Sequence, residues 1–334
     1  MKKNLLLIVF VCAFFISGCT TKRQYFEPEN VTGEMKFTSQ LSSEIVSTSI
    51  NGAILEDGTV ISLNGIEKNL KVSKDVSLLD HTNDTFIISK LNGEIYVIDN
   101  NGKTIFSKKF PVAIVSAATD GELLATLSSE NDIQLININT NETLLDYKSS
   151  IAYAQDSRMA PPYFMSSLII FPTLDGKIIV VEKQSGRIIR DVVVSNEPFF
   201  NNIIYLDVVG DRMFAATATK IIMISPTITT NHRGEIKNIK IYNNNVFIFE
   251  KDGNIIKADL DLRRIKSKDF PFAIFSNVAV KNGFLYALEK NGHIIKIDEN
   301  LENSEIYKLD DEVENRSFVS KDGIYYDDRY LEIK

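Results

Sequence analysis

Hydrophobic and polar positions along this chain form short β-type runs separated by tight turns, and one stretch shows the pattern most plainly. Between residues 86 and 110 the chain reads FIISKLNGEIYVIDNNGKTIFSKKF. Three apolar runs, rich in β-branched and aromatic residues, are separated by Asn92-Gly93 and Asn101-Gly102. Such runs favour strands, and Asn-Gly pairs favour two-residue type I′ hairpin turns. We therefore predict three strands joined by two tight turns, the first of type I′.

The same unit recurs along the chain. Its turns fall at positions 58, 93, 132, 176, 220, 253, 292 and 323, with degenerate copies at 124–136 and 214–224. A spacing of roughly 40 residues, with four strands per unit, is typical of β-propeller blades. One unit alone would expose both of its edges, so the copies must pack together. The pattern predicts an all-β fold, an eight-bladed β-propeller, with seven blades as the alternative.

The beginning and the end of the repeat region suggest how the ring closes. Few residues remain after Gly323 for a complete four-stranded blade. Residues 34–38, in contrast, have an alternating strand pattern outside any repeat. We predict that this N-terminal strand pairs with the last blade near Asp322-Gly323. Such pairing would protect both terminal edges at once.

The N-terminus carries a processing signal. Two lysines precede an apolar stretch over 5–16, which is too short to span a bilayer and typical of a secretory signal peptide. It ends in ISGC, which resembles a bacterial lipobox with Cys19 as the acylated (for example palmitoylated) first residue of the mature chain. An ordinary signal peptide followed by a free cysteine is the alternative. We predict a signal peptide over 1–18, a lipidated tether over 19–30 and one propeller domain over 31–334.

Charge and cysteine content limit the kinds of partner and of site that this chain can have. The formal net charge is −7, which argues against nucleic acid or an anionic membrane surface as the main partner. Cys12 would leave with the signal peptide and Cys19 would be acylated, so no disulfide and no Cys-based metal site or nucleophile would remain. The protein would then meet the membrane only through its lipid. Thr20, where enteric lipoproteins retained in the inner membrane have Asp, favours the outer membrane, facing the periplasm.

The repeat pattern resembles a known family. An apolar run, then Asp-Gly or Asn-Gly, then a second strand ending in Asp is similar to the PQQ-like repeat of bacterial propellers. With the lipobox in front, residues 31–334 resemble the BamB family of the outer-membrane β-barrel assembly machine. The resemblance implies a non-enzymatic periplasmic scaffold that binds the POTRA domains of BamA without a cofactor. A scaffold for a secretion, motility or peptidoglycan-linked complex, and a quinone- or sugar-processing enzyme, remain as alternatives.

Two stretches that interrupt the repeat are candidate partner-binding segments. In the longer one, Arg158 precedes an Ala-Pro pair, and this is similar to the loop with which the BamB family docks on BamA. The flanking leucines of that loop are absent here. Met159 and Tyr163 lie beside Arg158, and aromatic residues, Met and Arg are typical of interfaces. Phe199 and Phe200 form the second candidate.

No catalytic or metal-binding motif is present. The sequence lacks H-E-x-x-H, G-x-S-x-G, G-x-G-x-x-G and C-x-x-C. His81, His232 and His293 are far apart along the chain, and His293 follows a hairpin turn. That position favours a solvated turn residue over a metal ligand. We therefore predict no catalytic residue, no cofactor and no metal site.

Overall fold

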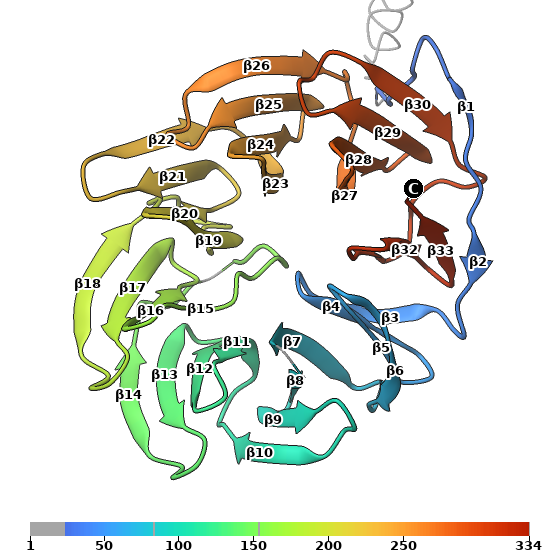
Figure 1. The fold of residues 1–334 in the computed structure, drawn as a ribbon. Helices are drawn as coiled ribbons and strands as arrows, with labels where there is room; N and C mark the ends of the chain where they lie inside the picture. Colours follow the sequence, from blue (N-terminus) through green and yellow to red (C-terminus); the bar gives the residue numbers. More distant parts are fainter. Residues whose placement is uncertain (1–23, 83, 153, 334) are drawn as a thin grey trace, which may run out of the picture.

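The computed structural model of the chain describes residues 24–82, 84–152 and 154–333. Its strands form a closed ring of eight blades, which confirms the predicted eight-bladed β-propeller (Figure 1). Each blade is a sheet of four antiparallel strands, and the seventh has an additional strand that pairs in parallel. Among the described residues no helix is long and apolar enough to cross a bilayer.

In each blade the strands follow one another from the centre of the ring to its rim. The first four blades comprise β3 (Ile45–Thr48), β4 (Gly52–Leu55), β5 (Thr59–Ser62) and β6 (Gly65–Lys71); β7 (Val76–Thr82), β8 (Thr85–Lys90), β9 (Glu94–Asp99) and β10 (Thr104–Lys109); β11 (Ile114–Thr119), β12 (Leu123–Ser128), β13 (Asp132–Asn137) and β14 (Thr143–Lys148); and β15 (Tyr163–Phe164), β16 (Leu168–Pro172), β17 (Lys177–Glu182) and β18 (Ile188–Val193).

The remaining blades have the same order, except that the N-terminal strands β1 and β2 complete the last two. They comprise β19 (Tyr205–Val209), β20 (Arg212–Ala216), β21 (Lys220–Ile224) and β22 (Thr229–Arg233); β23 (Ile236–Tyr242), β24 (Asn245–Glu250), β25 (Asn254–Asp259) and β26 (Arg264–Asp269); β27 (Phe275–Lys281), β28 (Phe284–Glu289), β29 (His293–Asp298), β30 (Ser304–Lys308) and β1 (Gly33–Glu34); and β31 (Ser317–Val319), β32 (Gly323–Tyr326), β33 (Arg329–Glu332) and β2 (Ser39–Gln40).

The three strands predicted between residues 86 and 110 are β8, β9 and β10, but the predicted type I′ turn between the first two is wrong. Gly93 has φ +91°, whereas Asn92 is not among the residues with positive φ. The amide of Gly93 donates to the carbonyl of Lys90 at 3.0 Å, which gives a type I turn followed by a left-handed glycine. The type I′ signature, two successive positive φ angles, occurs instead at Asn243-Asn244, between β23 and β24, and at Asn282-Gly283, between β27 and β28.

In five blades the hairpin glycine also bonds to the chain that leaves the blade. Gly253 has φ +94°, and a Cβ atom there would lie 1.9 Å from the carbonyl oxygen of Phe270. The carbonyl of Gly253 accepts a hydrogen bond from the amide of Phe270 at 2.9 Å, just after β26. In blade three Asn131 takes the glycine position with φ 71°. Four other glycines accept the corresponding bond: Gly58, Gly93, Gly176 and Gly292.

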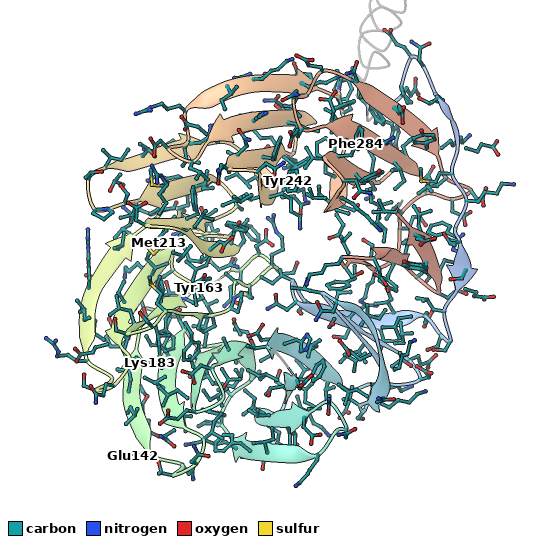
Figure 2. The ribbon with its side chains drawn as sticks, in the orientation of Figure 1. Glu142, Tyr163, Lys183, Met213, Tyr242 and Phe284 are labelled. Atoms are coloured by element: carbon teal, nitrogen blue, oxygen red, sulfur yellow. The ribbon has the colours of Figure 1, made fainter. Side chains whose placement is uncertain are left out.

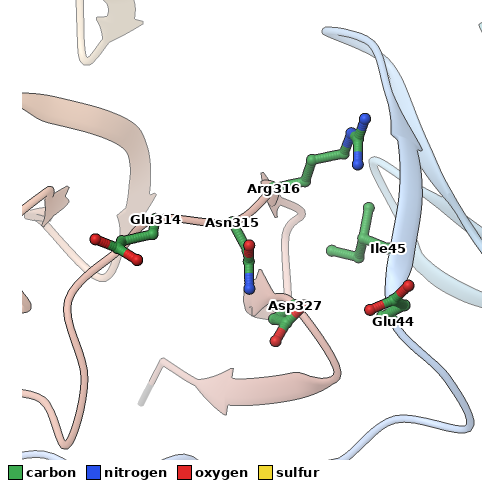
Figure 3. Close-up of a pocket in the computed structure, with 6 residues that line it drawn as sticks. All are labelled: Glu44, Ile45, Glu314, Asn315, Arg316 and Asp327. Carbon is green, nitrogen blue, oxygen red and sulfur yellow. The ribbon is translucent and has the colours of Figure 1, made fainter.

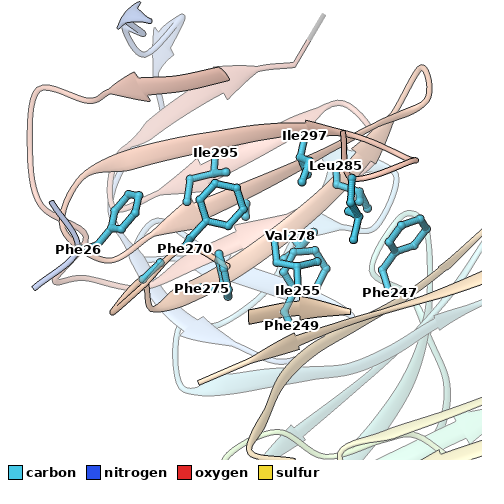
Figure 4. Packing of buried hydrophobic residues seen from close by; sticks show 13 residues of the cluster. Phe26, Phe247, Phe249, Ile255, Phe270, Phe275, Val278, Leu285, Ile295 and Ile297 are labelled. Atoms are coloured by element: carbon cyan, nitrogen blue, oxygen red, sulfur yellow. The ribbon is translucent and has the colours of Figure 1, made fainter. Parts of the chain in front are cut away.

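The apolar core is divided among the interfaces between neighbouring blades. Eight clusters of buried side chains are found among the described residues, and each draws its members from two adjacent blades. Between blades six and seven, Phe249 and Phe275 meet edge to face at 5.3 Å (Figure 4). Phe26 belongs to the same cluster and is 5% exposed. The segment predicted as a tether is therefore fixed to the propeller at this residue.

The N-terminal segment closes the ring, as predicted, although its strands differ in position. β2 pairs antiparallel with β33 and β1 pairs in parallel with β30, so the predicted strand 34–38 falls largely between them. Phe37 stacks on Tyr326 at 6.0 Å, and the guanidinium of Arg329 lies 4.5 Å from the ring of Phe37. In this last blade the Gly323 turn joins the first and second strands, whereas the other repeat turns join the second and third.

Candidate partner-binding platform and central funnel

Both predicted partner-binding segments lie on one face of the ring. Because successive strands of a blade run in opposite directions, the connections between blades lie on the same side as the turns between second and third strands. We call this side the connection face. Residues 149–162 connect β14 to β15, and residues 194–204 connect β18 to β19. These two loops pack together, and we call them the paired-loop platform.

Asn202 holds the platform together. Its side chain is fully buried. Its Oδ1 accepts a hydrogen bond from the amide of Asp156 at 2.7 Å, and its Nδ2 donates to the carbonyl of Arg158 at 2.7 Å. Two backbone bonds add to this, from Phe200 to the carbonyl of Ala154 and from Ala160 to the carbonyl of Ile203, both at 3.0 Å. The two loops that sequence reasoning treated as separate candidates thus form one unit.

Arg158 links the platform to blade six. Its Nε donates to Asp156 at 2.8 Å, and Nη2 forms an ion pair with the same carboxylate. Nη1 donates to the carbonyl oxygens of Ile236 and Lys237 at 3.1 and 2.6 Å. The guanidinium lowers the pKa of Asp156, against the effect of burial. Arg158 therefore positions the loop, and its predicted role in partner binding stays a prediction.

Met159 and Tyr163 contribute to packing. Met159 packs against the cluster between blades three and four, and its sulfur accepts a hydrogen bond from Asn202 at 3.3 Å. Tyr163 packs against the cluster between blades four and five, as does Met213, and both residues are labelled in Figure 2. Both side chains are partly buried. Both side chains thus pack against the clusters between the blades that the platform joins, and their predicted contact with a partner is untested.

Phe199 and Phe200 are the exposed members of the predicted set. Their side chains are 58% and 55% exposed, and Ile151 of the adjoining loop is 69% exposed. Leu91 and Phe272 are also exposed on the connection face, at the hairpin of blade two and after β26. Sequence reasoning missed these three additional residues. Their sequence signal was a large apolar residue in a turn or loop, where no strand or core requires one.

A cavity of about 530 Å³ lies at the centre of the ring. It is lined by first strands of blades one, five, six, seven and eight and by part of the platform, which extends toward the centre in Figure 1. We call this cavity the funnel. It was not predicted, because the residues that line it come from five blades and one loop.

The charged groups of the funnel are mostly cationic. Arg158, Lys237 and Lys240 line it together with one carboxylate, Asp207. Burial lowers the pKa of Lys240, and burial together with nearby Arg158 lowers the pKa of Lys237. Asp207 accepts a hydrogen bond from the hydroxyl of Tyr205 at 3.2 Å, and burial raises the pKa of that tyrosine.

A second cavity of similar volume lies at the seam between blades eight and one (Figure 3). Glu44, Glu314 and Arg316 line it, and its lining is mostly polar. The amide of Ile45 donates to the carbonyl of Asp327 at 3.1 Å beside it. The cavity marks the place where the ring closes.

The prediction that His293 is a solvated turn residue is wrong. Its side chain is 8% exposed, and its Nδ1 lies 3.3 Å from Oε2 of the fully buried Glu289. Phe26 covers the imidazole edge to face at 5.5 Å. Burial lowers the pKa of His293, and burial raises the pKa of Glu289 to about 7.

Cys19 and the signal peptide, both predicted from the sequence, fall outside the described residues. In the part of the chain that the structure describes, no three His, Cys, Asp or Glu side chains are grouped so that they could hold a metal ion.

Comparison with known proteins places the chain in a family. No protein-family model matches the sequence. The plasminogen-binding protein PgbB of Helicobacter pylori strain J99 is 30% identical over 388 aligned positions, which cover 99% of this chain and 71% of that protein. The chain belongs to the PgbB family. The PgbB protein of a second Helicobacter pylori strain is 29% identical and covers 98% of the chain.

Solved structures establish the likeness in fold between this PgbB-family chain and BamB. BamB from Moraxella catarrhalis superimposes with a TM-score of 0.68 over 88% of this chain and 99% of that one, at 14% identity. The C-terminal WD40 domain of Sif2 gives a TM-score of 0.67 over 91% of this chain, at 13% identity. The PgbB-family chain is therefore a BamB-like β-propeller. At these identities the likeness concerns the fold alone.

Proposed function

We propose that this protein is a non-enzymatic, lipid-anchored scaffold of the cell envelope that binds a protein partner through the connection face. The observation that carries the proposal is the exposed apolar group of Ile151, Phe199 and Phe200 on a rigid platform. Large apolar side chains presented beside polar ones by a fixed framework are typical of interfaces. Asn202, which is fully buried, supplies the rigidity because it bonds both loops.

Two partners are consistent with the relatives. The BamB-like fold supports a POTRA domain of BamA, or a comparable periplasmic module, as the partner in outer-membrane protein assembly. The name of the PgbB relatives supports plasminogen. A protein that faces the periplasm could meet BamA, whereas a protein exposed at the cell surface could meet plasminogen. The localisation of the anchored protein therefore distinguishes the two partners.

The test compares a double variant, Phe199→Ser with Phe200→Ser, with a matched control, Ile189→Ser. Ile189 is 49% exposed on β18 of the same blade but lies at the rim. Purified proteins are immobilised and offered solubilised envelope protein or plasminogen. Loss of two interface aromatic side chains should weaken binding by about 2 kcal/mol or more, roughly thirtyfold. Circular dichroism and the Tm should stay unchanged.

Capture of the same partner at full yield by the double variant would place the interface elsewhere. Equal loss in the Ile189→Ser control would mean that binding depends on general surface hydrophobicity. For the anchor, Cys19→Ala should move the protein from the membrane fraction to the soluble fraction, provided that the precursor is still cleaved. Retention in the membrane fraction by that variant would contradict the lipid anchor.

A further inference from the structure

We propose that the funnel is a ligand site in which the amine of Lys240 holds a carboxylate. Lys240 lies on β23 and lines the cavity. Within the described ranges of the chain, its amine makes no hydrogen bond and no ion pair. A partly buried ammonium group without a counter-charge is unfavourable, and an anion placed within about 4–6 Å favours its charged form.

The other polar groups of the funnel leave few free donors. Nδ2 of Asn238 donates to the carbonyl of Phe275 at 3.4 Å, and Nδ2 of Asn277 donates to the carbonyl of Ser317 at 3.0 Å. Thr48, Ser157 and Ser276 also line the cavity, and their hydroxyls make no hydrogen bond with another described residue. The ammonium group of Lys240 and these hydroxyls are therefore available to a bound acceptor.

Charge and size together define the ligand class. Three cations and one carboxylate, Asp207, line the funnel, whereas the whole chain has 37 Lys and Arg against 44 Asp and Glu. The guanidinium of Arg158 is committed to Asp156, and the amine of Lys237 lies near the carboxylates of Asp156 and Glu235, so a single negative group at Lys240 is the best match. A doubly charged phosphate would be repelled more strongly by Asp207. The volume, about 530 Å³, is in the range of small-ligand sites.

The carboxylate can belong to a free polycarboxylate or to an acidic side chain of a peptide. Isothermal titration of the purified full-length protein with citrate, with an acetylated Gly-Glu-Gly amide and with inorganic phosphate separates these sources. The variant is Lys240→Met. The matched control is Lys251→Met, because Lys251 is exposed, lies outside the funnel and pairs with Glu235 at 3.2 Å.

We expect one carboxylate probe to bind with a stoichiometry of one. Affinity should fall at least about tenfold in Lys240→Met, since hydrogen bonds to charged groups are strong ones, and should be unchanged in Lys251→Met. A second measurement needs no substitution: the NMR-detected pKa of the Lys240 amine should rise when the probe binds. No binding of either carboxylate, tighter binding of phosphate, or unchanged affinity in folded Lys240→Met would overturn the proposal. So would an unchanged amine pKa at saturation.

Discussion

Substitution of Glu289 tests the polar pair that lies beneath Phe26. Glu289 is fully buried at the end of β28. Its Oε1 accepts a hydrogen bond from the amide of Ile274 at 3.2 Å, and its Oε2 accepts one from Asn291 at 2.8 Å. Burial outweighs these bonds and raises the pKa from 4.5 to about 7. The folded protein therefore retains a proton that the unfolded chain releases.

The sign of the effect follows from proton binding. Between the two pKa values of Glu289 the folded state binds more protons, so stability falls as the pH rises from about 4.5 to about 7. At 1.36 kcal/mol per pKa unit, the loss is about 3 kcal/mol. His293 acts oppositely, because its lowered pKa makes stability rise with pH below about 6.5. Of these two groups, only Glu289 lowers the free energy of unfolding as the pH rises above about 6.5.

Glu289→Gln should remove this loss, since the amide retains an acceptor oxygen and cannot ionise. With an unfolding entropy of roughly 0.65 kcal/mol/K for about 310 residues, its Tm should exceed that of the wild type by about 5 °C near pH 8. Near pH 5 the two proteins should melt alike. Circular dichroism melts over this pH range measure the difference.

Glu250→Gln is the matched control, because Glu250 ends β24 as Glu289 ends β28, and its carboxylate contacts His232 and Asn254 at 3.0 Å. We expect this control not to exceed the wild-type Tm near pH 8. A Glu289→Gln protein whose Tm follows the wild type at every pH would show that the buried carboxyl group does not titrate as argued.

Three further predictions concern the framework. Gly253→Ala should lower the Tm more than Gly121→Ala, because both glycines have positive φ but a Cβ atom meets the backbone only at Gly253; equal losses would contradict the role of close approach. Phe26→Ala should release the N-terminal segment and speed its proteolysis by about two to four orders of magnitude, given the 3–5 kcal/mol typical of such truncations; unchanged cleavage would contradict docking. Deletion of 33–40 should expose two sheet edges and cause aggregation, measured by light scattering; a deletion variant that stays monomeric with the wild-type Tm would contradict closure.

Much of the architecture could be predicted from the sequence, because it depends on interactions between near neighbours. Alternating apolar residues define the strands, and turn residues such as Gly93 and Gly253 mark the hairpins whatever the rest of the chain does. Repetition of that unit then implied blades, and the short final repeat implied closure by an N-terminal strand. The type of turn at Gly93 was mistaken, because the Asn-Gly pair is compatible with more than one hairpin loop.

The tertiary structure alone decided what the notable side chains do, because their partners lie far away in sequence. Arg158 bonds to carbonyl oxygens of Ile236 and Lys237 in another blade, and Asn202 joins two loops. His293 follows a turn, yet Phe26 and Glu289 bury it. The unpaired amine of Lys240 is visible only once first strands from several blades surround a common cavity. Burial and charge balance depend on which blades face one another, and ring closure determines that arrangement.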